Sequence, residues 1–264
     1  QCLLHLAPIT PLILAMTMAV IYLIWGRDMH AEPAARERVM RFDERGAITD
    51  VRLLKQSLSV LALVILGFVL AHPLHLEPAT IAMGGAALLL LLDNFPHNAE
   101  TQSEHVHKTF GEVEWVTIFF FLGLFMVVHG IETAGVLTLL ASKVITWTGG
   151  DLAITAQAIL WVSAVASSIV DNIPFVATMI PLIKSMAPVF GGEEQLMPLW
   201  WALALGACLG GNGTLIGASA NLIVAGISER AGHPIRFLAY TLLAFPLMLM
   251  SIAVSSVYIH FRYL

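Results

Sequence analysis

Residues 167–181 read Ser-Ser-Ile-Val-Asp-Asn-Ile-Pro-Phe-Val-Ala-Thr-Met-Ile-Pro and interrupt an apolar run that extends from Leu152 to Ile183. A single helix of that length would measure about 48 Å, whereas the hydrocarbon core of a bilayer is about 30 Å thick. The only charge in the run is Asp171, and Pro174 suits the first turn of a new helix. The stretch therefore predicts two helical arms joined by a polar tip, a re-entrant hairpin over 152–190. One kinked crossing is the alternative.

A second break follows in residues 195–228, which carry no charged residue. The middle of this segment, residues 210–221, reads Gly-Gly-Asn-Gly-Thr-Leu-Ile-Gly-Ala-Ser-Ala-Asn. Each glycine inside a helix costs about 1 kcal/mol relative to alanine. Glycine-interrupted apolar segments are typical of the binding sites of secondary transporters. We therefore predict a discontinuous transmembrane helix over 196–230. The alternative is a continuous helix whose glycines pack closely against a neighbouring helix.

The composition places the chain in a membrane. Hydrophobic residues make up 58% of the 264 residues and charged residues 12%, and the mean hydropathy is +0.83. Soluble proteins have about 45–50% apolar and about 25% charged residues, so a soluble enzyme and a disordered chain are excluded. The net charge of −5 offers no basic field, and we expect no nucleic-acid partner. Because only helices and closed barrels satisfy the backbone in lipid, and no alternating pattern is present, we predict an all-α polytopic membrane protein.

The basic residues orient the chain. Seven of the 13 Lys and Arg residues lie between residues 27 and 55, and short loops rich in these residues stay in the cytoplasm. We therefore expect a multi-pass protein of the cell (inner) membrane with a basic cytoplasmic linker at 27–56. With a hairpin, Glu193 and Glu194 lie outside, and Arg230 and Arg236 lie in the cytoplasm. A kinked crossing would reverse both positions and place the arginines outside. Because basic residues stay in the cytoplasm, the hairpin is favoured.

Other apolar segments predict ordinary spans, and these are Leu6–Trp25, Leu58–Ala71, Ala79–Leu92, Trp115–Val128 and Phe237–Ile259. Residues 93–114 are expected to form a solvated loop, and a metal site at His105 and His107 is the alternative. Residues 132–148 carry polar interruptions, which favour an interfacial helix rather than a span.

Asp171 is the only carboxylate in the two broken segments, and an ionisable group at membrane depth is a functional-site hypothesis. A buried carboxyl group holds a proton and a bound cation displaces it, so such a group can exchange one for the other. Alternatively, the half-helix ends near Pro174 and Ser219 could hold an oxyanion, or Asp171 could merely cap its helix. We predict substrate or ion binding by Asp171, Asn172, Asn212, Gly213, Thr214, Ser219 and Asn221.

Two residues at the outer end of a predicted span are candidate gate groups. They are His129 and Glu132, and the alternative is that they are ordinary interface residues. We expect no cofactor, and no metal beyond a transported cation at Asp171. Cys2 and Cys208 have neither the spacing of metal ligands nor that of a disulfide framework.

The two broken blocks, residues 167–181 and 204–221, resemble the ArsB/NhaD permease family of the ion-transporter superfamily. That family includes arsenite permeases, sodium/proton antiporters and the P protein, and the blocks are most similar to the P-protein branch. The resemblance implies an inverted-repeat fold in which each half holds a re-entrant hairpin and a discontinuous helix around a central site. It also implies a homodimer of the full-length protein.

The chain departs from that pattern because it contains one hairpin and one broken helix, where the family has two of each. We therefore interpret residues 1–26 as the last span of a missing N-terminal half. Residues 27–56 would then link the halves, and residues 57–264 would form the C-terminal repeat. A half-size transporter that pairs in opposite orientations is the alternative, but the charge bias of the linker opposes it.

These observations predict a secondary active transporter that moves an inorganic ion and is coupled to protons or sodium. Sodium/proton antiport and arsenite or anion permeation both fit, and an organic anion carrier for citrate or dicarboxylates is the alternative. An intramembrane enzyme and a channel are hypotheses from other classes. The enzyme would need a base beside a nucleophile such as Ser219, and the channel would need repeated rings of pore residues.

Overall fold

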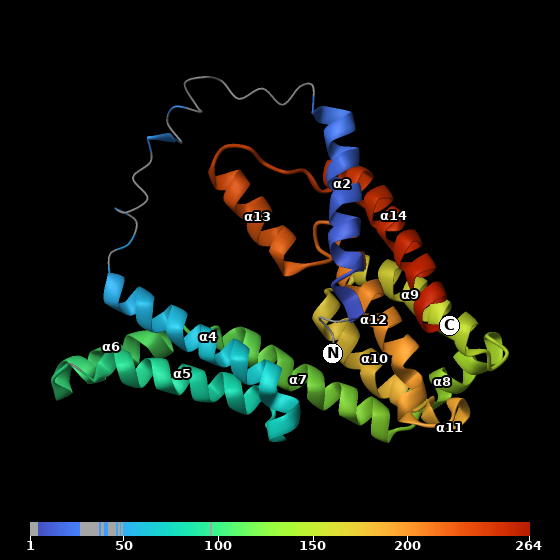
Figure 1. Cartoon of the computed structure of the whole chain (residues 1–264), viewed down its shortest axis with the longest axis horizontal. Coiled ribbons are helices and arrows are strands. Elements are labelled where there is room, and N and C mark those ends of the chain that lie inside the picture. The colour runs from blue at the N-terminus through green and yellow to red at the C-terminus, as the bar shows by residue number, and fades with distance from the viewer. Residues whose placement is uncertain are drawn as a thin grey trace. The chain divides into compact units, whose positions relative to one another are not determined.

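The computed structural model describes residues 5–26, 50–95 and 97–264, with isolated described positions at 37, 40, 41, 46 and 48. The secondary structure assigned to these residues is helical (Figure 1). The contacts divide the chain into two units, His30–Trp115 and a larger unit that joins Gln1–Met29 to Val116–Leu264. Most of the predicted linker at 27–56 lies outside the described residues.

The described part of the smaller unit includes the helices α4 (Val51–Leu74), α5 (Pro78–Asn94) and α6 (Ala99–Gly111). The first two are antiparallel and in close contact, because a Cβ added at Gly67 would lie 2.7 Å from Ile81 and one added at Gly85 would lie 2.2 Å from Val64. They include the spans predicted at 58–71 and 79–92.

Helix α6 was not expected, since residues 93–114 were predicted to be a loop. Asn98 caps the helix by accepting a hydrogen bond from the Thr101 N–H at 3.0 Å. Glu100 in the first turn and Lys108 in the last turn match the helix dipole. Local capping and charge placement therefore outweigh the low hydropathy that suggested a loop. Among the described residues no group of three His, Cys, Asp or Glu side chains is arranged to hold a metal.

The larger unit begins with α2 (Ile9–Trp25) and continues with α7 (Trp115–Thr133) and α8 (Val136–Trp147). The α7 and α8 axes differ by 67°, and Gly135 between them has a φ of 75° that favours glycine. The segment predicted as an interfacial helix is therefore a separate helix after a sharp bend. Within the described residues of both units, three helices are long and apolar enough to cross a membrane, and they are Val51–Ala71, Leu152–Ile169 and Phe237–Tyr263. The bent pair α7 and α8 would be a fourth if it forms one broken span.

The apolar run at 152–183 forms two helices, α9 (Leu152–Ile169) and α10 (Asn172–Lys184), with extended backbone at Val170 between them. After α11 (Ala187–Phe190) and the short helix η2 (Glu193–Leu196), α12 (Met197–Gly210) lies against α9. The two are parallel, because Gly206 contacts Leu160 and Gly210 contacts Ala164. Since α9 and α12 point the same way, the chain between them must return, as the predicted hairpin requires.

Helix α12 ends where the second break was predicted. A short turn, η3 (Gly211–Gly213), and an extended stretch separate it from α13 (Ser219–Arg230). The glycines also pack closely against α9, so the break and the close packing offered as its alternative are both present. An added Cβ at Gly206 would lie 2.5 Å from the Leu160 carbonyl oxygen.

The last helix, α14 (Phe237–Tyr263), measures about 40 Å at 1.5 Å per residue. It is antiparallel to α9: Met248 lies beside Gly213 at the break, and the Gln157 amide donates to the Ser256 carbonyl at 3.0 Å. Met248 is near the middle of α14. The hairpin tip and the helix break therefore lie near the middle of a helix that is long enough to span a bilayer.

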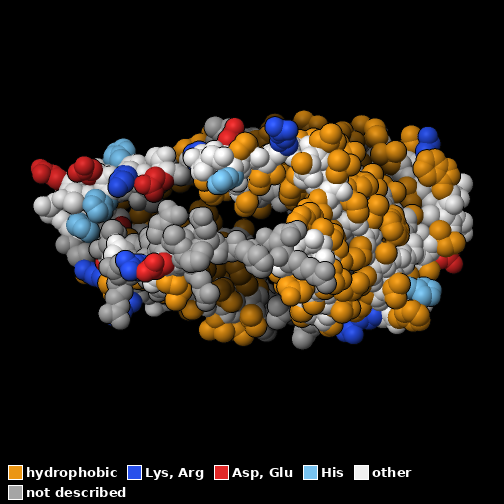
Figure 2. Space-filling view, turned by 90° about the horizontal axis from the view of Figure 1, so that it is seen from above, with side chains coloured by type: hydrophobic (Ala, Val, Ile, Leu, Met, Phe, Trp, Pro, Cys, Tyr) orange, Lys and Arg blue, Asp and Glu red, His pale blue; other side chains and the backbone are white. Residues whose placement is uncertain are grey.

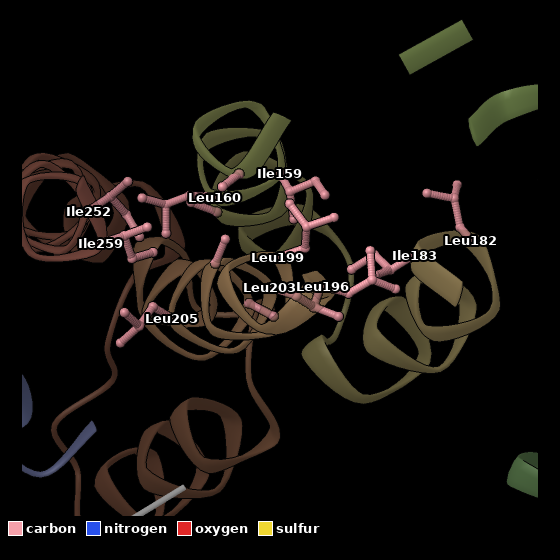
Figure 3. Close-up of a cluster of buried hydrophobic side chains, with 14 of the residues drawn as sticks. Ile159, Leu160, Leu182, Ile183, Leu196, Leu199, Leu203, Leu205, Ile252 and Ile259 are labelled. Atoms are coloured by element: carbon pink, nitrogen blue, oxygen red, sulfur yellow. The ribbon is translucent and has the colours of Figure 1, made fainter. Parts of the chain in front are cut away.

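The core of this unit is formed by leucine and isoleucine side chains of α9, α10, α12 and α14 (Figure 3). Figure 3 shows Leu160 of α9 near Ile252 of α14, and Leu199 of α12 near Ile159. Because lipid is as apolar as leucine, close packing rather than exclusion of water holds such helices together. Helix α2 joins this core through Ile9 and Ile13. Just before α2, the His5 ring stacks on Trp201 with centroids 4.9 Å apart, and its Nδ1 is 2.7 Å from the Tyr263 hydroxyl oxygen in a hydrogen bond.

Hydrophobic side chains cover much of the right-hand part of the surface seen in Figure 2. Phe119, Val162 and Leu238 are each more than 60% exposed, as are other large apolar residues along α4, α7 and α14. Monomeric soluble proteins rarely expose such continuous apolar surface, whereas lipid requires it. The chain is therefore a polytopic, all-α membrane protein.

The hairpin orientation gives a labelling prediction. In a background with Cys2 and Cys208 replaced by alanine, we expect Trp147→Cys and Glu194→Cys to react with an impermeant thiol reagent from the outside, and His233→Cys from the cytoplasm. All three are exposed, and each lies near a loop glycine whose positive φ would strain a cysteine. Labelling of positions 147 and 194 from opposite sides would contradict the re-entrant hairpin.

Candidate functional site: the hairpin tip and the helix break

Asp171 connects the two broken segments. Its Oδ1 accepts a hydrogen bond from the Ile173 N–H at 3.0 Å and so caps α10. Its Oδ2 accepts a hydrogen bond from the Ser219 hydroxyl, with 2.8 Å between the two oxygens, and Ser219 is the first residue of α13. The cap considered from the sequence is therefore real, but it uses only one carboxylate oxygen. The other oxygen links the hairpin tip to the broken helix.

Two helix N-termini meet at this carboxylate. Helix α10 begins at Asn172, which is half-buried, and α13 begins at Ser219. Each N-terminus carries about half a positive charge, which stabilises a nearby anion. Ala218 gives α13 no side-chain cap. The site therefore has one carboxyl group held between two partial positive ends.

Thr214 and Asn221 stabilise the unwound backbone. The Thr214 hydroxyl donates to the Ser168 carbonyl at the end of α9 and accepts from the Gly217 N–H at 3.1 Å. The Asn221 amide donates to the carbonyls of Gly211 and Thr214, each at 3.1 Å. A helix break frees carbonyl groups that need partners in a membrane, and these two side chains supply them.

The remaining residues predicted for the break lie elsewhere around it. Gly213 is buried, and an added Cβ would lie 3.0 Å from Met248 and 3.1 Å from Ser168. The Asn212 side chain is exposed and lines a separate cavity of about 400 Å³ between α2, α12 and α14. The structure thus brings Ser219 into contact with Asp171 and places Asn212 at a different cavity.

A cavity of about 420 Å³ lies beside the hairpin tip, and α7 forms one of its walls. The tip and α13 contribute Asp171, Ile173, Pro174 and Ser219, and α7 contributes Thr117, Phe120 and Phe121. Sequence reasoning missed the α7 residues. Their spacing of i, i+3 and i+4 places them on one helix face, but nothing in the sequence connects that face with Asp171. Ser167 was also missed, and its hydroxyl ties α9 to α12 by donating to the Ala207 carbonyl at 2.8 Å.

The two candidate gate residues contact each other near the end of α7. His129 Nδ1 lies 3.7 Å from Glu132 Oε2, and both side chains are more than half exposed. Neither lines the cavity beside Asp171.

Comparison with known proteins adds a family to this geometry. A family model described as a citrate transporter, CitMHS, matches residues 1–206. The chain belongs to the citrate transporter family. This family membership fits the helix breaks and the exposed apolar side chains of the described residues.

Several relatives of this CitMHS-family chain are named as transporters or membrane proteins. It is 42% identical over 261 residues to an uncharacterised transporter of Mycobacterium tuberculosis, covering 98% of the chain and 58% of the relative. It is 36% identical over 263 residues to a 46 kDa membrane protein of Mycobacterium leprae, covering 99% and 59%. It is 40% identical over 230 residues to the P protein of Sus scrofa, covering 84% and 26%. No solved structure matches the chain significantly. The chain thus spans a little over half the length of its mycobacterial relatives.

Proposed function

We propose that this CitMHS-family chain belongs to a secondary active transporter that moves an inorganic ion, coupled to protons or sodium, in the manner of the ArsB/NhaD permeases. The observation that supports this proposal is the pair of hydrogen bonds at the Asp171 carboxylate. One oxygen accepts the Ile173 N–H and so caps α10, and the other accepts a hydrogen bond from the hydroxyl of Ser219 in the broken helix. A proton or cation arriving at Asp171 competes with these two contacts. Occupancy of the site would therefore alter the link between the hairpin tip and the broken helix, and so could favour one arrangement of the two over another.

The charge of the cavity favours a cation over a polyanion. Its lining residues include one carboxylate and no basic side chain. A tricarboxylate in this cavity would lie near the Asp171 carboxylate with no basic side chain among the lining residues, and the repulsion between like charges would oppose its binding. Sodium/proton antiport is therefore the form of the proposal that this half of the site supports best.

An organic anion carrier for citrate or dicarboxylates is the second candidate. The match to the citrate transporter family favours it, and so do the two helix N-termini, which attract carboxylate oxygens. Such a carrier would need Asp171 protonated or paired with sodium before the anion binds. Antiport and anion symport thus predict opposite effects of protons on substrate binding at this residue.

A flux panel in proteoliposomes separates these candidates. Sodium, arsenite and citrate are each tested for uptake against an imposed pH gradient, with counterflow to exclude a channel. We expect sodium to exchange for protons. Citrate uptake driven by protons, with no sodium exchange, would replace the antiport proposal by the anion carrier. No flux of any of the three, with a folded and complete protein, would contradict the transporter proposal.

The length comparison leads to a complementation prediction. Because the chain spans 58% of its Mycobacterium tuberculosis relative, we expect the 264-residue chain alone to give no coupled flux. Co-expression with a second polypeptide that supplies the part of the relative not matched by this chain should restore flux. Coupled flux by the purified chain alone would contradict the proposal that a second half completes the site.

We further propose that the complete protein is a homodimer in the cell (inner) membrane and that His129 and Glu132 act as an outer gate. We also propose that the chain is a transporter component and not an enzyme; because the Ser219 hydroxyl donates to the Asp171 carboxylate, a hydrolase assay is the test of the enzyme alternative. Asn172 and Ser219 are the proposed ligands nearest to Asp171. Asn212, Gly213, Thr214 and Asn221 are proposed to act by shaping and orienting the break.

A further inference from the structure

The residues of α7 add an aromatic surface to the cavity beside Asp171. Thr117, Phe120 and Phe121 share one helix face, and the two phenyl rings meet edge to face with centroids 5.4 Å apart. The Phe120 side chain is 56% exposed. The tip side of the cavity therefore carries the Asp171 carboxylate with the Ser219 hydroxyl, and the α7 side carries two aromatic rings and the Thr117 hydroxyl.

The size of the cavity exceeds what a bare metal ion needs. At about 420 Å³ it falls within the range of about 300–1,000 Å³ that is typical of small-molecule sites. Such sites are mainly apolar and contain a few placed polar groups that fix the orientation of the ligand. The lining here follows that pattern, with Asp171 as its only charged member.

We propose that this cavity binds a small organic cation, an ammonium group carried on a compact apolar body. The ammonium lies against Asp171, with the hydroxyl oxygens of Thr117 and Ser219 available to accept its N–H groups. The apolar body lies against Phe120 and Phe121, whose ring faces attract positive charge. The inference rests on the proposed role of Asp171 as the ion-binding group and extends it to a second class of ligand.

Three probes of nearly equal shape test the charge requirement. They are tert-butylammonium, neutral tert-butanol and anionic pivalate, titrated by calorimetry into the purified full chain in detergent. We expect tert-butylammonium to bind and the other two not to bind. Asp171→Asn should abolish the binding. Equal binding of tert-butanol, or unchanged binding by Asp171→Asn, would overturn the proposal.

Ring variants test the aromatic wall. Phe120→Leu and Phe121→Leu keep apolar bulk but remove the ring, and each should weaken tert-butylammonium binding about three- to tenfold. Phe120→Tyr keeps the ring and should bind normally. The matched control is Phe119→Leu, on the same helix but outside the cavity lining, which should leave binding unchanged. If both ring variants bind like Phe119→Leu while circular dichroism shows intact helices, the proposal is wrong.

Sodium binding separates this inference from the proposed function. If radioactive sodium binds in an Asp171-dependent manner and tert-butylammonium does not displace it, the ion site stands and the organic-cation site fails. If tert-butylammonium binds through Asp171 but the complete transporter gives no sodium, arsenite or citrate flux, the organic-cation site stands and the proposed function fails.

Discussion

Asp171→Asn in the complete transporter should abolish or uncouple proton- or sodium-coupled flux while the protein still reaches the membrane in normal amounts. The asparagine oxygen can accept the Ile173 N–H and so keep the cap of α10. Its amide can donate to the Ser219 oxygen and so keep the contact between the two breaks. The variant therefore removes the titratable charge and little else. The measurement is flux against pH at matched expression.

Asp151→Asn is a matched control for that result. Asp151 caps α9 in the same way, by accepting the Ile154 N–H at 2.9 Å, but it does not line the cavity. We expect its flux to follow the wild-type curve. If the Asp171→Asn curve also superimposes on the wild-type curve, then Asp171 is only a cap and the coupling group lies outside this cavity.

The helix breaks could be predicted because their causes are local. An aspartate with a proline three residues later, within an apolar run, favours the start of a helix, and α10 begins at Asn172. Likewise, α12 ends at Gly210, where the glycine-rich stretch begins. Helix α6 was not predicted because its residues lack an apolar pattern, and the cap at Asn98 that stabilises its start is seen in the structure.

The functional roles around the breaks were less predictable, because a polar side chain in a membrane can serve either a ligand or the backbone. Asn221 and Thr214 donate to backbone carbonyls, whereas Ser219 donates to Asp171. These residue types offer the same donors, so only the path of the unwound chain decides which partner each one meets. The contribution of α7 to the cavity could not be predicted either, because it depends on which helix packs beside the hairpin tip.

Close contact between α9 and α12 holds the tip and the break at the same level, and Gly210 packs directly against the backbone of α9. A Cβ added at Gly210 would lie 2.4 Å from the Ala164 carbonyl oxygen and 2.6 Å from the Ala164 Cα. Both atoms belong to the backbone and cannot rotate away. Gly210→Ala should therefore separate the helices and disturb the Thr214–Ser168 hydrogen bond just beyond the contact.

We expect Gly210→Ala to lower the free energy of unfolding by about 1–3 kcal/mol, which corresponds to a fall in Tm of about 2–12 °C for a chain of this size. Circular dichroism of the purified chain during heating measures the change. Gly226→Ala is the control, because nothing lies within 4 Å of its added Cβ and alanine favours the interior of α13. It should be neutral or stabilise the chain by up to about 1 kcal/mol. Equal Tm values for the two variants would mean that α9 and α12 do not approach closely at Gly210, and the alignment of Ser219 with Asp171 would then need another cause.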